Sequence, residues 1–563
     1  MAKQLIECVP NFSEGRDMSV IKQITDEIES VEGVRLLDVD PGMATNRTVV
    51  TFVGEPDPVV QAAFLAIKKA AELIDMSKHH GEHPRMGATD VCPLVPVSGI
   101  RMKEVVRYAH KLGAMLGKAL DIPLYMYEAA ASRPERRNLA AVRSGEYEAL
   151  PEKLKKPEWK PDYGPAKFNP RSGATVIGAR DFLIAYNVNL NTTSVRRANS
   201  VAFDVREKGR VKRKGDPIVG AIVRDKKGET VRIPGACPSV KGIGWFIEEY
   251  GIAQISMNLT NINVSPLHVV FEECCKSAER RGLRVTGSEL VGLVPLGVML
   301  ETGRYFLRKQ KRSLGVSEEE IIKIAVKSLG LDELSEFDPR KKIIEYQLED
   351  AAANPLLAMN LRDFANETAS ESPAPGGGSI AAYVGALGAS LATMVANLSA
   401  NKRGWDKRWK TFSGWAEKGQ RSKDALLQLV DEDTRSFKSI IEAFRLPKTS
   451  LEEVELRKEA IQAATRRAIE VPFEVMKVSL ASFKLIQTMA EIGNPNSVSD
   501  AGVGALCART AIHAAFLNVK INVGDLEDKA FVRQILKEGT KMCREADKLE
   551  KLVRKIVDEK IKG

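Results

Sequence analysis

The sequence predicts a multidomain protein of mixed fold class, in which two α/β (α+β sandwich-like) subdomains precede an all-α helical-bundle domain. From about residue 4 to residue 348, short apolar runs typical of strands alternate with amphipathic runs of helical period. After residue 379, almost every segment has the aliphatic or small-residue stripe of a long helix. The length of 563 residues also favours several domains over a single core.

The composition is that of an ordinary globular protein, with 44% hydrophobic and 28% charged residues. Lys and Arg number 84 against 74 Asp and Glu, and this excess of +10 favours an anionic partner. The basic residues are dispersed, so an acidic metabolite is favoured over nucleic acid. Seven scattered cysteines predict no disulfide framework and a reducing cytoplasm. We find no apolar leader and no run of about eighteen apolar residues, and we expect neither secretion nor a membrane span.

The first subdomain is expected over residues 1–181. Its strands are predicted at residues 5–9, 34–39, 48–53, 91–97 and 124–127, and its helices at 18–28, 58–76 and 102–116. Two loops between these elements hold dense polar groups, at 11–15 and 38–47. Asp38 and Asp40 are two residues apart on a predicted strand, so their side chains should share one face.

The stretch 77–90 is predicted to be an active-site loop. It holds three of the chain's six histidines, and Gly81, Pro84 and Gly87 exclude a regular helix or central strand. His79 and His80 have an alternative reading as a solvated helix end. A metal site is disfavoured, because Gly81 and Pro84 spoil the helix that would align His79 with His83. His83 lies just before a buried strand, and we expect it to perform acid/base chemistry.

Residues 155–173 are rich in proline, lysine and aromatics and are predicted to form a long surface segment. Its glycines permit close backbone approach, and Lys167 and Arg171 can meet carboxylates. A solvated loop is an equally good reading. The part of interest consists of Gly164, Pro165, Ala166, Lys167, Phe168, Asn169, Pro170, Arg171, Ser172 and Gly173.

The second subdomain is expected over residues 182–348. Its strands are predicted at 182–188, 219–223, 230–233 and 243–257, and its helices at 195–207, 266–281 and 318–328. The basic run 206–214 precedes a probable hairpin at 225–228 and is interpreted as an exposed flap. A linker at 349–357 should then lead into the helical domain.

The helical domain is expected over residues 358–563. Its long helices are predicted at 380–398, 405–444, 451–492, 499–521 and 526–561, with Pro472 kinking the third. The turn at Gly376, Gly377 and Gly378 opens directly into the first of them. Its exposed N–H groups could bind an anion or a carbonyl oxygen, and the alternative is a packing role for the small residues.

One helix of this domain has an apolar stripe interrupted by a single carboxylate. Leu426, Val430, Asp433, Phe437, Ile440 and Phe444 follow one another at steps of three or four and share a face. Burial would raise the pKa of the Asp433 carboxyl and make it a proton donor or acceptor near neutral pH. The alternative is a buried hydrogen-bond or ion-pair anchor. Asp431 lies about 200° around the helix and should face solvent or another subunit.

Four motifs in order along the chain resemble the formimidoyltransferase-cyclodeaminase family. They occupy residues 7–15, 81–87, 241–245 and 373–379. The resemblance implies a bifunctional folate enzyme of histidine degradation. The first two subdomains would transfer the formimino group from N-formimino-L-glutamate to N5 of tetrahydrofolate. The helical domain would then form 5,10-methenyltetrahydrofolate and release ammonia.

The resemblance also assigns residues and partners. It implies His83 as the transferase histidine, 164–173 as the folate-binding stretch and Asp433 as the cyclodeaminase carboxylate. It further implies tetrahydrofolate as co-substrate, and the net charge of +10 is compatible with a polyglutamylated form. The expected assembly is a cytoplasmic homo-oligomer, such as an octamer, with dimer contacts through the helical domain. No metal, nucleic acid or membrane is expected.

Other residues are weaker candidates, chosen by residue type. Arg47, Arg85 and Lys167 could bind the carboxylates of the substrates, and Asp40 or Asp90 could orient the imidazole. The segment 210–237 is longer than in mammalian members, and His79–His80 is a doublet where one histidine is commoner. Two alternatives stay open: a helical domain that is a methenyltetrahydrofolate cyclohydrolase, or a silent folate-binding scaffold.

Overall fold

The computed structural model describes residues 4–43, 46–81, 84–216, 219–348 and 354–562. Its contacts divide the chain into two compact units. The first contains Met1–Val298 with Leu329–Leu348, and the second contains Met299–Ser328 with Glu349–Gly563. The segment Met299–Ser328 therefore groups with the long helices by contact, whereas the sequence places it in the second subdomain.

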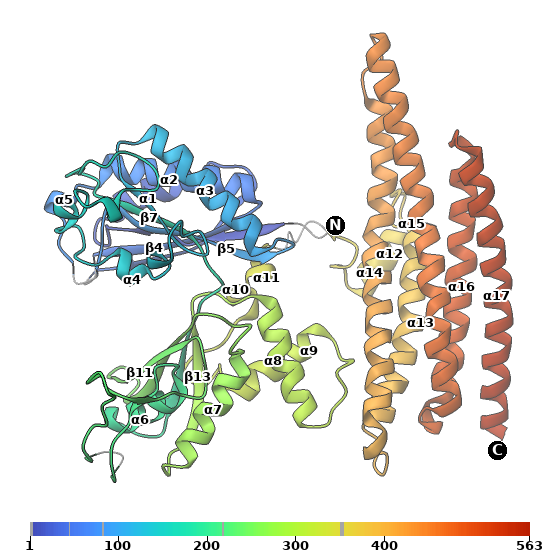
Figure 1. The fold of residues 1–563 in the computed structure, drawn as a ribbon. Helices are drawn as coiled ribbons and strands as arrows, with labels where there is room; N and C mark the ends of the chain where they lie inside the picture. Colours follow the sequence, from blue (N-terminus) through green and yellow to red (C-terminus); the bar gives the residue numbers. More distant parts are fainter. Residues whose placement is uncertain (1–3, 44–45, 82–83, 217–218, 349–353, 563) are drawn as a thin grey trace. The chain divides into compact units, whose positions relative to one another are not determined.

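The first unit begins with a seven-stranded mixed sheet, which confirms the α/β class (Figure 1). Its central path runs β1-β4-β2-β5-β7-β6, and β3 pairs with β4 at one side. Pairing is antiparallel except where β7 joins β5 and β6 in parallel. The strands are β1 (Leu5–Cys8), β2 (Asn11–Phe12), β3 (Val34–Gly42), β4 (Arg47–Gly54), β5 (Thr89–Ser98), β6 (Leu124–Glu128) and β7 (Thr175–Ala179).

Three amphipathic helices cover one face of this sheet (Figure 1). They are α1 (Met18–Glu29), α2 (Pro56–Leu73) and α3 (Met102–Ala119). They bury Ile6, Phe52, Leu94 and Met126 with their own apolar residues. The predicted helix over 58–76 ends at Leu73, and a short 3-10 turn (Met76–Lys78) follows. The opposite face of the sheet is left for the short helices α4 (Leu139–Val142) and α5 (Leu150–Lys153), and for polar side chains.

The second sheet of this unit is antiparallel, in the order β11-β12-β8-β13. It contains β8 (Ile184–Leu190), β11 (Val240–Ile247), β12 (Ile252–Leu259) and β13 (Val285–Val291). Helices α6 (Val195–Val205) and α7 (Leu267–Glu279) pack on it. The strand predicted over 243–257 is wrong, because the chain turns back at 248–251, where Gly251 adopts a positive φ of 63°.

The strand predicted at 219–223 is also wrong within the described residues. Residues 210–216 and 219–233 contain a small hairpin of β9 (Arg210–Val211) and β10 (Arg232–Ile233), plus the isolated bridges Arg213–Ile222 and Arg224–Thr230. Its charged, glycine-containing sequence has little apolar surface to bury in a longer ladder. Strands β7 and β13 and helix α8 (Leu296–Lys309) were not predicted.

The second unit is a bundle of long helices, as predicted (Figure 1). They are α13 (Gly377–Ala400), α14 (Trp409–Arg445), α15 (Leu451–Ile492), α16 (Val498–Asn522) and α17 (Lys529–Lys562), with the shorter α9 (Glu318–Leu329) and α12 (Leu361–Thr368). Alanines and glycines of α13 and α16 allow close packing, and these helices contact α14 and α15. Pro472 lies inside α15, which continues to Ile492.

Two helical segments are long and apolar enough to cross a membrane by length and composition alone. Among the described residues they are Gly377–Ala400 and Pro495–Asp525. In the structure 61% and 50% of their apolar windows are buried. Core helices of a bundle pass the same test, because their apolar surface faces other helices.

Candidate active sites

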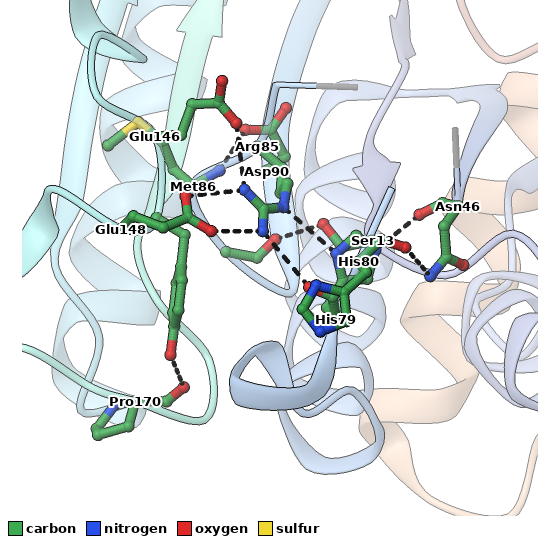
Figure 2. A network of polar contacts seen from close by, with 12 residues as sticks. Ser13, Asn46, His79, His80, Arg85, Met86, Asp90, Glu146, Glu148 and Pro170 are labelled. Atoms are coloured by element: carbon green, nitrogen blue, oxygen red, sulfur yellow. Dashed lines mark hydrogen bonds and ion pairs between the residues drawn. The ribbon is translucent and has the colours of Figure 1, made fainter. Parts of the chain in front are cut away.

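The polar loops predicted in the first subdomain come together at one end of its sheet (Figure 2). The Ser13 hydroxyl donates to the carbonyl of Gly87 at 2.8 Å, and the Ser13 N–H donates to the Ala88 carbonyl. The Asn46 side chain accepts from the Gly15 N–H and donates to the His80 carbonyl at 3.0 Å. The described residues of segments 11–15, 38–47 and 77–90 therefore form one cluster although the segments are far apart in sequence.

His79 is buried in this cluster, so its reading as a solvated helix end is wrong. Its Nε2 lies 2.8 Å from the Asn46 carbonyl and its Nδ1 accepts from Arg85 Nε at 3.4 Å. A ring that donates through Nε2 and accepts through Nδ1 is neutral. Burial lowers the pKa of His79, which favours the same form. His80 is exposed, in agreement with its solvated reading.

His83, the predicted transferase histidine, lies outside the described residues, as does Glu82. Arg85, two residues further along the loop, is fixed by ion pairs. Arg85 is 8% exposed and pairs with Glu148 at 2.7 Å and with Glu146 at 3.2 Å (Figure 2). A substrate carboxylate would have to displace these acids to reach Arg85, so its guanidinium is better explained as an anchor of the loop.

Asp90 anchors the same loop from the start of β5. It is fully buried, accepts the Met86 N–H at 3.0 Å and forms a close ion pair with Arg143. Burial raises the pKa of the Asp90 carboxyl, and the charge of Arg143 opposes that rise. Arg143 was not predicted, since its position after the short helix α4 has no periodic or motif signal.

The open face of the first sheet contributes further charges. Asp38 pairs with Thr51, Asp40 with Val49 and Gly42 with Arg47, so both aspartates share a face with Arg47, as predicted for the aspartate pair. Burial lowers the pKa of Arg47, with Arg143 adding to the effect and Asp90 and Asp40 opposing it. The Arg47 Nη1 also donates to the Asn11 side chain at 3.0 Å.

The predicted folate stretch 164–173 borders the histidine loop directly. Ala88 N–H donates to the Ser172 carbonyl at 2.9 Å, and Ala174 N–H donates to the Met86 carbonyl at 3.0 Å. Gly173 has a positive φ of 66°, and a Cβ there would overlap the Met86 carbonyl. The glycine is thus required by the close approach of two backbones, which sets the stretch against residues 86–88.

The rest of the stretch is irregular and partly exposed. Asn169 accepts the N–H groups of Arg171 and Ser172 at 3.0 Å, and Phe168 packs on Tyr147 with a ring distance of 5.4 Å. Lys167 is exposed. Besides these local bonds, the Arg171 guanidinium donates to the Glu72 carbonyl and the Ser172 hydroxyl donates to the Ala71 carbonyl, so the end of α2 also holds the loop.

A cavity of about 430 Å³ opens beside this cluster within the first unit. Pro84, Arg143 and Glu146 line it on the side of the histidine loop, and Lys241 of β11 lines it from the second sheet. Two cations and the acids Glu128 and Glu146 make it a polar cavity, suited to a charged metabolite.

The second candidate site surrounds Asp433 in the helical unit. Asp433 accepts hydrogen bonds from both the backbone N–H and the hydroxyl of Ser379, the latter at 3.3 Å. Burial raises the pKa of the Asp433 carboxyl, and the Ser379 bonds oppose the rise. Asp433 thus lies at the N-terminus of α13, where N–H groups favour a carboxylate. The geometry suits both a helix cap and a proton donor.

The glycine turn makes room for this carboxylate. A Cβ added at Gly378 would overlap the Asp433 carboxylate, and one at Gly377 would press on the Asn518 side chain of α16. Gly376 is the N-cap residue of α13 and its Cβ position is nearly open. At Gly378 the absent side chain is therefore needed for close approach, whereas Gly376 leaves space beside the helix N-terminus.

Asp431 is not exposed, contrary to the prediction. It is 1% exposed and accepts the N–H groups of Leu356 at 3.0 Å and Leu357 at 3.2 Å. The helical wheel correctly separates it from Asp433, but the segment before α12 packs on that side of α14. The two acids therefore differ in role: Asp431 holds a chain segment, while Asp433 faces a helix N-terminus.

Comparison with known proteins covers nearly the whole chain. The model described as "Formiminotransferase domain, N-terminal subdomain" matches residues 5–180, "Formiminotransferase domain" matches 185–349 and "Formiminotransferase-cyclodeaminase" matches 360–541. The mouse formimidoyltransferase-cyclodeaminase is 44% identical over 96% of this chain and 97% of the mouse protein.

Two shorter relatives match separate parts. A glutamate formimidoyltransferase of Streptococcus pyogenes is 41% identical over 55% of this chain and 94% of its own length. A methenyltetrahydrofolate cyclohydrolase of Methylorubrum extorquens is 34% identical over 36% of this chain and 97% of its own length. With three family models in order and full-length relatives above 40% identity, the chain belongs to the formimidoyltransferase-cyclodeaminase family.

Proposed function

We propose that this protein is a bifunctional folate enzyme. Its first unit transfers the formimino group from N-formimino-L-glutamate to tetrahydrofolate, and its helical unit converts the product to 5,10-methenyltetrahydrofolate and ammonia. The observation that supports this most directly is the pairing of residues 86–88 with 172–174. It sets the proposed folate stretch beside the loop of the proposed catalytic histidine.

In the transferase reaction, N5 of tetrahydrofolate attacks the formimino carbon and the bond from that carbon to the glutamate nitrogen breaks. A proton must leave N5 and a proton must reach the departing nitrogen. We assign this relay to His83, because one imidazole can accept the first proton and donate the second. Lys241, which is exposed and lines the cavity, supplies positive charge for a substrate carboxylate.

In the cyclodeaminase reaction, N10 attacks the same carbon, and the former imino nitrogen leaves as ammonia after it accepts a proton. We assign the donor to Asp433, since burial raises the pKa of its carboxyl. Ser379 fixes the carboxyl from one side. The N-terminus of α13 lies at the same place and is suited to a carbonyl or other electron-rich group of the folate.

The experiment that tests this function supplies purified protein with formiminoglutamate and tetrahydrofolate. We expect stoichiometric glutamate, ammonia and methenyltetrahydrofolate, the last detected by its absorbance. The relative named as a cyclohydrolase makes a second helical-unit activity worth testing in parallel, with methenyltetrahydrofolate as substrate. Hydrolysis of that compound without ammonia release from 5-formiminotetrahydrofolate would assign the helical unit to cyclohydrolysis instead.

Gly378→Ala should selectively impair the cyclodeaminase. The new methyl group would occupy the space of the Asp433 carboxylate and force it to move. A misplaced catalytic group can cost about a hundredfold in rate, so we expect ammonia release to fall by about that factor with transferase turnover unchanged.

The matched control for Gly378→Ala is Gly414→Ala, on α14 of the same unit, where an added Cβ has open space. This variant should keep full activity and gain slightly in stability, because alanine favours helix over glycine by about 1 kcal/mol. Equal ammonia release by the two variants would argue against a tight fit of Asp433 to the glycine turn.

We also propose a homo-oligomer with contacts through the helical unit. Phe437, Ile441 and Phe444 lie four and three residues apart on α14 and are 45%, 36% and 54% exposed. A second copy of the chain could bury this stripe, which belongs to the helix that carries Asp433. Light scattering should show an assembly that Phe437→Ser with Phe444→Ser weakens; a monomer at working concentration would contradict the proposal.

A further inference from the structure

The motif at 241–245 forms one edge of the second sheet, and its residues alternate between two environments. Gly242 and Gly244 face α6, where a Cβ at Gly244 would overlap the backbone of Asn199. The Asn199 side chain bonds both the N–H and the carbonyl of Gly244, at 3.0 and 3.1 Å, and so pins this edge strand to the helix. Lys241, Ile243 and Trp245 consequently point to the other face.

Trp245 is 38% exposed on that face, and its indole is held from below by a chain of hydrogen bonds. Its Nε1–H donates to Gln254 Oε1 at 3.2 Å, and Gln254 Nε2 donates to Asn189 Oδ1 at 2.8 Å. Asn189 Nδ2 then donates to Glu333 Oε2 at 2.6 Å. This series of hydrogen bonds thus crosses β11, β12 and β8 and ends at the Glu333 carboxylate, beyond the sheet.

The hydrogen bonds of this series can run in one direction only, from the Trp245 indole to the Glu333 carboxylate. An indole N–H can only donate and an ionised carboxylate can only accept, so each amide between them has one possible orientation. Gln254 and Asn189 are 1% and 0% exposed. Buried amides are costly unless they are fully bonded. Two leucines at positions 254 and 189 would fill the same space without the cost of burying amides. The hydrogen-bonded series is therefore better explained by the fixed orientation that it gives to the Trp245 ring.

The face around Trp245 leads to the transferase cavity. Lys241, on the same side of β11, lines that cavity together with Pro84 and Arg143. Trp245 lies four residues further along the strand, roughly 13 Å at the rise of a β-strand. Ile243 lies between them and is 54% exposed. A flat, partly apolar surface therefore extends from the cavity to a rigidly held indole.

We propose that Trp245 is a folate-binding residue of the transferase, whose indole stacks on a planar ring of the cosubstrate. Gln254 and Asn189 are its positioning residues. This inference rests on the proposed transferase function. Folate offers two such rings, the pterin and the p-aminobenzoyl group, and both share the flat aromatic chemistry that a tryptophan face accepts. Lys241 would meet negative charge of the substrate at the cavity end.

The test uses the full-length protein and compares Trp245→Leu with Phe246→Leu. Phe246 is 39% exposed, adjacent on the same strand and on its other face, so it is a matched control. Loss of a stacking contact of about 1.4 kcal/mol corresponds to about tenfold in binding. We expect the KM for tetrahydrofolate to rise about tenfold in Trp245→Leu, with the KM for formiminoglutamate and the melting temperature close to those of Phe246→Leu.

Two further measurements separate the ring contact from a structural effect. Trp245→Phe retains a ring but loses the N–H that anchors it, and its KM should lie between wild type and Trp245→Leu. Competitive inhibition by 6-methylpterin and by p-aminobenzoylglutamate identifies which folate ring stacks on Trp245. Trp245→Leu should weaken inhibition only by the fragment that contains that ring.

An unchanged KM for tetrahydrofolate in Trp245→Leu, or equal inhibition of both proteins by both fragments, would overturn the inference. Normal transferase turnover in the same experiment would leave the proposed function intact. Absence of turnover in the wild-type protein would count against the function itself, so the two failures are distinguishable.

Discussion

Asp433→Asn is expected to abolish ammonia release from 5-formiminotetrahydrofolate while transferase turnover continues. Asparagine preserves the size of the side chain and keeps one oxygen that can accept from Ser379, but it cannot donate a carboxyl proton. General acid catalysis typically contributes about 10²–10⁴-fold, so the cyclodeaminase kcat should fall by that order. The intermediate 5-formiminotetrahydrofolate should accumulate, as chromatography of the folates would show.

The pH dependence of the wild-type enzyme gives an independent check on Asp433. Burial raises the pKa of its carboxyl, and only the protonated form can donate to the leaving nitrogen. The cyclodeaminase kcat should therefore fall as the pH rises through that raised pKa. If kcat instead increased as the pH rises through this pKa, Asp433 would act as a general base and not as a proton donor.

Asp431→Asn is the control for the fold around Asp433. Asp431 accepts two backbone N–H groups in the interior of the unit, and an amide can accept only through one of its two atoms. An unsatisfied buried N–H costs about 1–3 kcal/mol, so Asp431→Asn should lower the free energy of unfolding while folded protein still releases ammonia. Full activity in Asp433→Asn would refute the catalytic assignment and leave the helix-cap explanation.

His83→Ala should have the reciprocal effect. Without the imidazole, the proposed proton relay from N5 to the glutamate nitrogen is lost, and transferase kcat should drop by about 10²–10⁴-fold. Cyclodeaminase turnover of supplied 5-formiminotetrahydrofolate should persist, because that reaction uses Asp433. Separate assays of glutamate release and ammonia release would measure the two effects in one preparation.

His80→Ala is the appropriate control for His83→Ala. The His80 side chain is exposed, and its carbonyl, which accepts from Asn46, is kept by the substitution. Its transferase turnover should stay near that of wild type. A comparable loss of transferase turnover in both variants would show that the loop tolerates no substitution. Unchanged turnover in His83→Ala would mean that another group relays the proton.

Local pattern determined much of this protein. The period of apolar residues predicted the α/β class, the switch to a helical unit and the bounds of α15 (Leu451–Ile492). The stripe on α14 predicted a buried Asp433, and burial does raise the pKa of its carboxyl. The same argument was wrong for Asp431, which is 1% exposed, and Phe437 and Phe444 of the stripe are exposed. Such features follow from residues within a few turns of one another. Motif resemblance supplied the reaction and nominated His83, a prediction that no described contact tests.

Only the tertiary structure decided which side chains are buried and what they meet. The neutral form of His79 is favoured because the Asn46 carbonyl, 33 residues away, meets its ring and because the loop folds Arg85 onto its other nitrogen. Asp431 is buried because residues 356–357 cover it. Arg143 finds Asp90 across 53 residues, and the Trp245 chain ends at Glu333, which is 144 residues from Asn189. Burial and electrostatics depend on distances in space, so periodicity along the chain carries no record of these partners.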